Sequence, residues 1–170
     1  MNTNILTIDP SVHSAGFAIW GFASLESALK KLEGKHRIPR PKKTYLLRSN
    51  CKEKDWLLDA EKVLGQFEEI LDRFEVSEAY CELPTYMAGA HGATASGSLQ
   101  KLCHVAGMFS MACLKRKIKF EYVSICDWKG TMGKKLVERR ITKLYGVGIL
   151  PYKKDEWDAI GIGLYKLGKF

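Results

Sequence analysis

Four acidic residues stand at positions from which folding could bring their side chains together. Asp9 ends the apolar stretch NILTID, and Glu82 ends a second one, VSEAYCE. Asp155 and Asp158 lie three residues apart, which places them on one face of a helix. A charge beside apolar strand residues is costly unless something pairs with it. The spacing therefore predicts one acidic site built from three distant segments.

The chemistry that such a cluster supports is metal-assisted hydrolysis. Carboxylates placed together repel one another, and some of them hold protons unless cations neutralise the charge. Hard oxygen ligands suit Mg²⁺ or Mn²⁺, which also bind phosphate oxygens. Two such ions, about 3.5–4 Å apart, activate a water molecule and stabilise the leaving oxygen of a phosphodiester. We therefore expect two Mg²⁺ ions per subunit, with Mn²⁺ as a substitute.

Each acid also has an ordinary structural interpretation. Asp9 precedes Pro10 and could simply start a turn. Glu82 could be an exposed residue at a strand end. Asp155 could cap the last helix, with Asp158 as a favourable charge in its first turn. Each signal is weak alone, and the prediction depends on their combination in this order.

The apolar spacing predicts the elements that must position these acids. Strands are expected at 4–10, 15–22, 43–49, 76–82 and 119–125, and helices at 55–74, 99–114, 133–145 and 155–168. The turn at 11–14 makes the first two strands an antiparallel hairpin, and the helix at 55–74 connects two parallel strands. If the first and fourth strands are adjacent and parallel, Asp9 and Glu82 emerge at the same sheet edge, where α/β proteins place their sites.

Length and composition bound the class of protein. The 170 residues, 46% of them hydrophobic and 27% charged, fit one soluble globular domain spanning 1–170. No apolar run is long enough to predict a membrane helix, and the N-terminus shows no secretion signal. Five cysteines without a CxxC pair indicate buried free thiols in a reducing cytoplasm, and a structural zinc site is not expected.

The formal net charge of +8 favours a polyanionic partner such as nucleic acid. The helix at 133–145 concentrates basic residues opposite an apolar face, and residues 35–43 form a basic loop of unassigned role. A solvated basic face is the ordinary interpretation. Beside an acidic metal site, the same residues would bind DNA phosphates. The candidate contacts are Lys129, Lys134, Lys135, Arg139 and Arg140.

Other side chains near these segments have two interpretations each. Tyr86 and Met87 lie in a Gly-, Ala- and Ser-rich segment, 84–98, that is expected to be mobile. They could stack on a base at a DNA crossover, at roughly 1–3 kcal/mol per base, or Tyr86 could pack back on the core. His13, in the first turn, could touch phosphate. His104 is expected to be a hydrogen-bonded core or interface residue.

Four motifs resemble, in order, those of one family. ILTIDPSVHSAGFAIW resembles its first motif, a strand ending in IDP followed by a turn, a glycine and a second strand, and AYCELPTYM resembles the second. SLQKLCHVAGMFSMAC resembles the helix that follows, and DEWDAIGIGLYKLG resembles the last motif. These motifs span nearly the whole chain, and they resemble the RuvC-type Holliday-junction resolvases of the RNase H-like superfamily, in the compact form found in bacteriophages.

The resemblance implies an α/β, RNase H-like fold with a five-stranded mixed sheet in the order 3-2-1-4-5, flanked by helices. It also implies a metal-dependent endonuclease that acts as a homodimer on four-way DNA junctions. In this chain Asp9 would bridge two ions, Glu82 and Asp158 would hold one each, and Asp155 would complete the shell or orient water. The apolar helix at 99–114 would then form the dimer interface, although burial within a monomer is also compatible with its composition.

The chain departs from the family pattern at several places. Ser11 replaces the usual glycine after IDP, and Glu156 and Trp157 replace small residues between the late acids. The segment between the second and third strands is longer and more basic than expected. Two other functions therefore remain open, namely an RNase H-like nuclease with broader branched-DNA or hybrid specificity and a catalytically inactive DNA-binding module. A sugar-kinase-type phosphotransferase needs two such domains, for which 170 residues leave no room.

Overall fold

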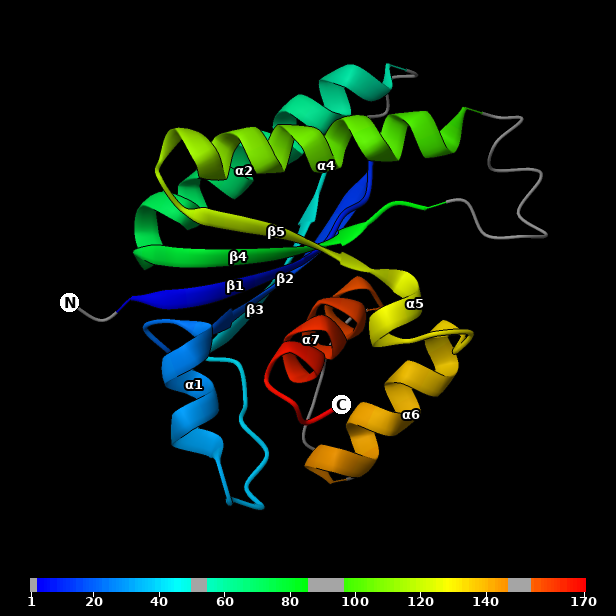
Figure 1. Cartoon of the computed structure of the whole chain (residues 1–170). Coiled ribbons are helices and arrows are strands. Elements are labelled where there is room, and N and C mark those ends of the chain that lie inside the picture. The colour runs from blue at the N-terminus through cyan, green and yellow to red at the C-terminus, as the bar shows by residue number, and fades with distance from the viewer. Residues whose placement is uncertain (1–2, 50–54, 86–96, 147–153) are drawn as a thin grey trace.

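A computed structural model describes residues 3–49, 55–85, 97–146 and 154–170 of the chain (Figure 1). Its centre is a five-stranded sheet in the order β3-β2-β1-β4-β5, which confirms the predicted order and fold class. β1 pairs in parallel with β4, and β4 with β5, whereas β2 and β3 are antiparallel to their neighbours. The strands are β1 (Asn4–Asp9), β2 (Ser14–Trp20), β3 (Lys43–Arg48), β4 (Val76–Leu83) and β5 (Lys119–Ser124).

Helices cover both faces of the sheet (Figure 1). α2 and α4 lie on one face, and α1, α5, α6 and α7 lie on the other. Because both faces are covered, every residue of β1 is buried, including the polar Asn4, Thr7 and Asp9. The helices are α1 (Leu25–Leu32), α2 (Trp56–Phe74), α4 (Ser98–Lys115), α5 (Ile125–Trp128), α6 (Lys134–Tyr145) and α7 (Lys154–Lys166).

Each face of the sheet has its own hydrophobic core. On the α2 and α4 side, three aromatic rings meet at the centre, with ring centroids 5.2 Å apart for Phe17 and Phe67 and 4.6 Å apart for Phe67 and Phe109. On the other side, Trp20 and Ile160 are fully buried between the sheet and α7. This second core fixes the helix that carries two of the candidate acids.

The predicted strands and helices match the observed ones within two residues at each end, and two short helices, α1 and α5, lie outside the predicted ranges. The short helix α5 directly follows β5 and was not predicted. Ser124 caps it, because its side chain accepts a hydrogen bond from the backbone N–H of Cys126 at 3.2 Å. α5 turns the chain back toward the sheet edge and so positions Trp128 and Lys129.

Several predictions about burial require correction. Cys81 and Cys113 are buried as expected, but Cys103 and Cys126 are exposed, and Cys51 lies outside the described residues. Cys103 is exposed because α4 buries only one stripe of its surface, so an apolar composition all round does not imply burial all round. Cys126 lies in the short helix α5, whose buried residue is Trp128.

The position of this stripe also leaves three other side chains of α4 exposed. His104 is exposed rather than part of the core, and its ring meets that of Trp56 edge-on with centroids 5.6 Å apart. Met111 and Leu114 are 55% and 54% exposed.

No helix in the described part of the chain has the length and apolar content that crossing a bilayer requires.

Candidate active site

The candidate site lies where β1 and β4 end and α7 begins. Asp9 is the last residue of β1, Glu82 is the penultimate residue of β4, and Asp158 lies in the first turns of α7. Asp9, Glu82 and Asp158 are 6%, 9% and 1% exposed, which excludes the interpretation of Glu82 as an exposed strand end. Asp155 lies one turn earlier, with its side chain 21% exposed.

Close packing sets the position of α7 against the sheet. A Cβ atom at Gly16 would overlap the backbone carbonyl of Asp155, so only glycine allows this approach. The Thr7 hydroxyl donates a hydrogen bond to the carbonyl of Ala159 at 2.7 Å and accepts one from Trp20 Nε1 at 3.0 Å. α7 is therefore tied to both β1 and β2, and the two late acids are held at the sheet edge.

Lys129 joins the acids of β4 and α7. Its Nζ lies 3.2 Å from Oε2 of Glu82 and 3.3 Å from Oδ2 of Asp158, and its side chain is only 12% exposed. The neighbouring Trp128 donates a hydrogen bond from Nε1 to the same Glu82 oxygen at 2.9 Å. α5 therefore orients Glu82 through one neutral donor and one cation.

Lys134, the first residue of α6, joins the remaining acids. Its Nζ lies 3.1 Å from Oδ1 of Asp155, 3.6 Å from Oδ2 of Asp158 and 3.9 Å from Oδ2 of Asp9. Ser14 donates a hydrogen bond to the other oxygen of Asp155 at 2.7 Å. Because the Asp158 oxygen is shared between the two ammonium groups, the four carboxylates form a single cluster.

Burial and mutual repulsion disturb the titration of this cluster. Burial raises the pKa of Asp9 well above its usual value, the charges of Glu82 and Asp158 raise it further, and Lys134 and Lys129 oppose the shift. Burial also raises the pKa of Glu82, against the lowering effect of Lys129. For Lys134, burial favours the neutral amine, but the surrounding carboxylates outweigh it and raise the pKa.

The donor set fits a divalent cation. Oδ1 of Asp158 is buried and has no hydrogen-bond partner among the described residues, so it offers a free ligand atom. The other donors are carboxylate oxygens, which Mg²⁺ and Mn²⁺ prefer. As they stand, no three acidic, histidine or cysteine side chains of the described residues lie close enough to hold one ion. The oxygens instead contact ammonium groups at 3.1–3.9 Å, so a bound ion would displace Lys129 or Lys134.

The remaining predicted residues fall into three groups. Lys135 and Arg139 are exposed on α6 as expected, and the guanidinium of Arg140 lies over the ring of Phe170 at 4.6 Å. Lys129 is largely buried against the acids, whereas Lys134 contacts them with a side chain that is still 55% exposed. Tyr86 and Met87 lie outside the described residues.

The first turn contains a contact that the sequence did not predict. Nδ1 of His13 lies 2.8 Å from Oδ2 of Asp59 on α2, and contact of His13 with phosphate stays a prediction. This contact ties the β1–β2 turn to the neighbouring helix. His13 therefore has a structural partner, and the turn that follows Asp9 is held in place from the α2 side of the sheet.

Sequence reasoning did not identify three residues that organise the site. Trp128 and Ser14 bind the acids through side-chain hydrogen bonds, and Gly16 makes room for α7. Gly16 lies two residues into β2, where glycine is unusual, and this was the one available signal. The roles of Trp128 and Ser14 depend on contacts between distant segments, which no local pattern encodes.

Comparisons with known proteins support the fold. No family model and no curated protein sequence matches the chain. The structure resembles that of RuvC from T. thermophilus in complex with a Holliday junction substrate, with a TM-score of 0.65, 16% identity, and coverage of 96% of this chain and 92% of that chain. A second T. thermophilus RuvC structure gives a TM-score of 0.63 at 15% identity, with the same coverage.

A eukaryotic structure shares the same fold. The yeast mitochondrial Holliday junction resolvase Ydc2 gives a TM-score of 0.51 at 12% identity, covering 98% of this chain and 79% of that chain. The RNase H-like fold and the resemblance to RuvC-type resolvases are therefore confirmed. At these identities the likeness establishes the fold, and activity has to be argued from the site.

Proposed function

We propose that the protein is a metal-dependent endonuclease that resolves four-way DNA junctions by paired symmetric nicks. The observation that carries this proposal is the convergence of three buried carboxylates, Asp9, Glu82 and Asp158, at one sheet edge. Burying carboxylates carries a desolvation cost, and buried titratable groups of this kind are typical of functional sites. The likeness to RuvC bound to a Holliday junction supports a branched DNA substrate.

The chain's own residues have separable roles in this proposal. Asp9, Glu82 and Asp158 hold two Mg²⁺ ions, for which Mn²⁺ can substitute, and Asp155 completes the shell or orients water. When bound, the ions supply an activated water and stabilise the leaving oxygen. Ser14 fixes one oxygen of Asp155, and Trp128 fixes one oxygen of Glu82. The opposite oxygen of Asp155 contacts Lys134 in the free protein, so a bound ion would take the place of that ammonium group.

The basic residues beside the site bind the DNA backbone. Lys129 and Lys134 compensate the acids in the free protein, and we infer that they move to the substrate phosphates when cations bind. Lys135 and Arg139 extend the positive charge along the exposed side of α6. Such contacts position DNA without reading its sequence. Tyr86 and Met87 remain proposed stacking residues at the crossover.

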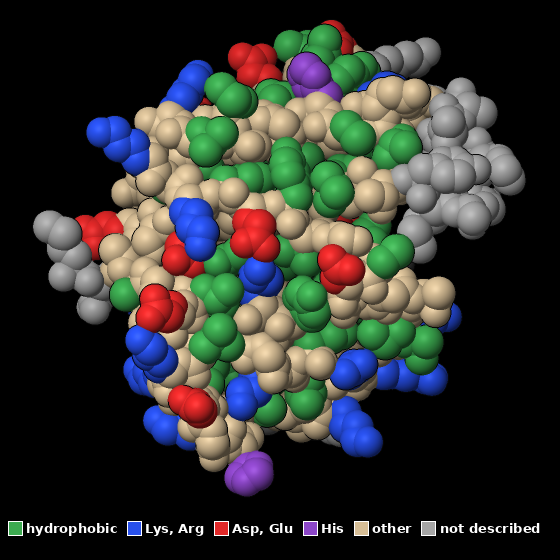
Figure 2. Space-filling model, viewed as in Figure 1, with side chains coloured by type: hydrophobic (Ala, Val, Ile, Leu, Met, Phe, Trp, Pro, Cys, Tyr) green, Lys and Arg blue, Asp and Glu red, His purple; other side chains and the backbone are tan. Residues whose placement is uncertain are grey.

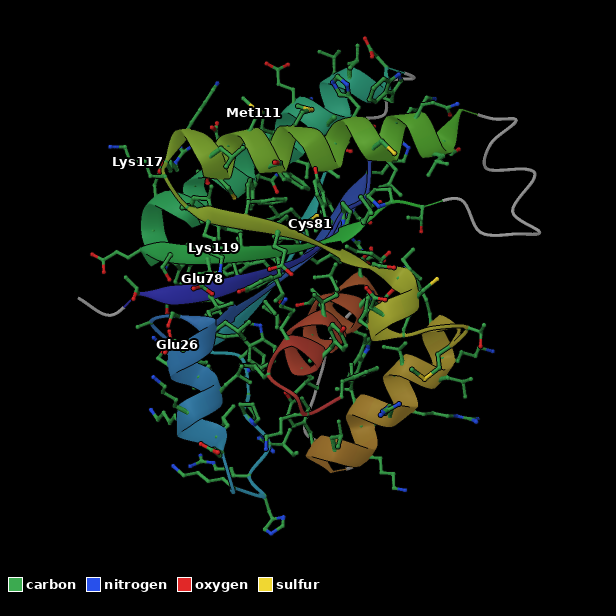
Figure 3. All side chains as sticks on the ribbon, viewed as in Figure 1. Glu26, Glu78, Cys81, Met111, Lys117 and Lys119 are labelled. Carbon is green, nitrogen blue, oxygen red and sulfur yellow. The ribbon has the colours of Figure 1, made fainter. Side chains whose placement is uncertain are left out.

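A homodimer completes the proposal, because a twofold-symmetric junction needs two sites for two symmetric nicks. α4 carries exposed apolar side chains at Met111 and Leu114, and Figure 3 shows Met111 on the side of α4 away from the sheet. We infer that this face of α4 meets its copy in a partner subunit. The dimer would act in the cytoplasm of a bacterium or of a phage-infected cell.

One observation favours an alternative. The ammonium groups of Lys129 and Lys134 lie among the carboxylates, as they would in a DNA-binding module that never binds metal. A nuclease with broader branched-DNA or hybrid specificity is the other alternative. Cleavage of a four-way junction, a linear duplex and an RNA–DNA hybrid, compared in the presence of Mg²⁺, separates these functions.

The decisive experiment uses a synthetic mobile junction and three variants. Wild type is expected to make paired symmetric nicks with Mg²⁺, and Asp9→Asn and Asp158→Asn are expected to bind the junction without nicking it. Asp127→Asn is the matched control, because Asp127 is an exposed carboxylate on α5 outside the cluster. It is expected to cut like wild type. Normal cutting by Asp9→Asn would show that the assigned site is wrong.

A further inference from the structure

A pocket of about 400 Å³ lies far from the acidic cluster, between α1, the end of β2 and the segment that leads into β3. We call it the basic pocket. Its lining includes apolar side chains such as Phe22 and Ile38 and five cationic residues, namely Lys31, Lys35, Arg37, Arg40 and Lys42. It contains most of the basic loop whose role the sequence leaves open.

The charge of the basic pocket is not neutralised. None of its five cations forms an ion pair with a carboxylate among the described residues. By contrast, Lys30 on α1, which is not part of the pocket lining, pairs with Glu26 at 2.7 Å. Glu33 is the single acidic residue between positions 31 and 42. Figure 2 shows lysine and arginine side chains around this half of the molecule, over α1 and α6. An anion is therefore the ligand that the pocket fits.

The fold holds some of these cations in place. The side chain of Lys42 crosses Gly21 at the end of β2, where an added Cβ would overlap it, and its Nζ donates to Oδ1 of Asn4 at 2.8 Å. Lys31 lies over the ring of Phe22, with Nζ 5.9 Å from the centroid. The pocket is thus a feature of the folded chain rather than a chance gathering of surface lysines.

α6 connects the basic pocket to the acidic cluster. Its first residue, Lys134, contacts Asp155, and its last residue, Tyr145, donates a hydrogen bond to the carbonyl of Pro39 at 2.7 Å. Arg40 lies over the Tyr145 ring and donates to its backbone carbonyl at 3.3 Å. Figure 1 shows α6 running from beside α5 down to this segment. The exposed cations of α6 therefore lie between the acidic cluster and the basic pocket.

The length of α6 gives the distance between the acidic cluster and the basic pocket. Its 12 residues span about 18 Å at 1.5 Å per residue. At roughly 3.4 Å per nucleotide along a strand, this is about five base pairs of duplex. We propose that the basic pocket binds the phosphate backbone of a DNA arm about five base pairs from the bond that is cut. This inference rests on the proposed function, and it assigns the insertion between β2 and β3 to substrate binding.

The test compares two double variants with equal charge changes. Lys35→Gln/Arg37→Gln removes two exposed cations of the pocket. Lys117→Gln/Lys119→Gln is the matched control, at the far edge of the sheet beside α4 and β5 (Figure 3). Affinity for a labelled four-way junction is measured without divalent ions over a range of salt concentrations. The slope of log K against log salt counts phosphate contacts, at about 0.9 per contact.

The pocket variant is expected to lower the magnitude of this slope by about 1.8, if each cation neutralises one phosphate. The ratio of wild-type to pocket-variant affinity then falls about 12-fold as salt rises from about 50 to 200 mM. The control variant is expected to keep the wild-type slope. An unchanged slope in the pocket variant overturns the inference, and so does an equal decrease in both variants.

A second measurement locates the contact on DNA. Neutral methylphosphonates placed about five base pairs from the cleaved bond are expected to weaken binding by wild type and to leave the pocket variant unaffected. An equal effect on both proteins contradicts the proposal. The two proposals can fail separately. If the salt slopes of wild type and the pocket variant differ as expected but wild type never cuts a junction, the nuclease function is wrong and the pocket assignment is supported. Loss of binding to phosphatidylserine vesicles, with DNA slopes unchanged, would instead assign the pocket to membranes.

Discussion

A single methyl group at Gly161 is expected to disturb Glu82 from a distance. Gly161 lies in α7 beneath the indole of Trp128, and an added Cβ would lie 2.5 Å from the Cζ3 atom of that ring. Ordinary contacts begin near 3.4 Å, so the ring must shift by close to 1 Å. The same ring donates the 2.9 Å hydrogen bond to Glu82. Gly161→Ala therefore tests whether packing in the core sets the geometry of the site.

Two opposing effects determine the magnitude. Alanine favours a helix over glycine by about 1 kcal/mol, whereas overpacking a core costs about 1–3 kcal/mol. Gly107→Ala in α4 is the matched control, because within the described residues no atom beyond its chain neighbours and the helix's own backbone lies within 4 Å of the added Cβ. The free energy of unfolding of Gly107→Ala should therefore rise by the helix preference of alanine alone, about 1 kcal/mol. The two variants should thus differ by about 1–3 kcal/mol in free energy of unfolding, or about 2–12 °C in Tm.

Activity provides the second measurement. A displacement of about 1 Å at a catalytic group can lower the rate about 100-fold. We expect Gly161→Ala to cut a junction roughly 10- to 100-fold more slowly at saturating DNA, and Gly107→Ala to cut like wild type. Adding Trp128→Phe should restore stability by making space but not activity, because phenylalanine lacks the N–H donor. If Gly161→Ala matches Gly107→Ala in both stability and rate, Trp128 does not position Glu82.

Three further predictions concern the charges and the surface of the protein. Because the pKa of Asp9 is raised in the folded chain, the metal-free folded protein holds a proton that the unfolded chain releases above its ordinary value of 3.8. The free energy of unfolding in EDTA should therefore fall as pH rises from about 4 through the raised pKa, and Asp9→Asn should flatten this dependence in denaturant titrations. A steeper dependence in Asp9→Asn would contradict the shift. Lys129→Gln removes the ammonium group from Glu82 and leaves Asp158 with Lys134 alone, at 3.6 Å, so it should cost about 3 kcal/mol in EDTA, and Mg²⁺ should recover more stability in this variant than it adds to wild type. If Mg²⁺ raises the free energy of unfolding equally in both proteins, the ion and the Lys129 ammonium group do not share one position. Met111→Glu/Leu114→Glu should convert a dimer to a folded monomer by light scattering, whereas Leu29→Glu, at another exposed apolar residue, should not; a wild type that is already monomeric would refute the α4 interface.

Much of the fold was accessible from local patterns. The apolar residues of 4–10 predict a strand, and the helical spacing of 55–74 predicts a crossover between parallel strands. Asp9 and Glu82 share one edge of the sheet because β1 and β4 are adjacent and parallel, an order that the family resemblance implied and the structure confirms. Burial was harder to predict on α4, where composition alone does not identify the stripe that faces the core.

The sequence by itself determined which acids are present and which elements carry them, because strand and helix periodicities are local properties. The shared sheet edge of Asp9 and Glu82 depended on the first and fourth strands being adjacent and parallel, which the family resemblance implied. Only the tertiary structure decided what surrounds them. The ammonium groups of Lys129 and Lys134 lie among the carboxylates, and Trp128 reaches Glu82 from a helix 46 residues further along the chain. These contacts join segments whose separation in sequence carries no information about their distance in space, since packing of α5, α6 and α7 on the sheet sets it.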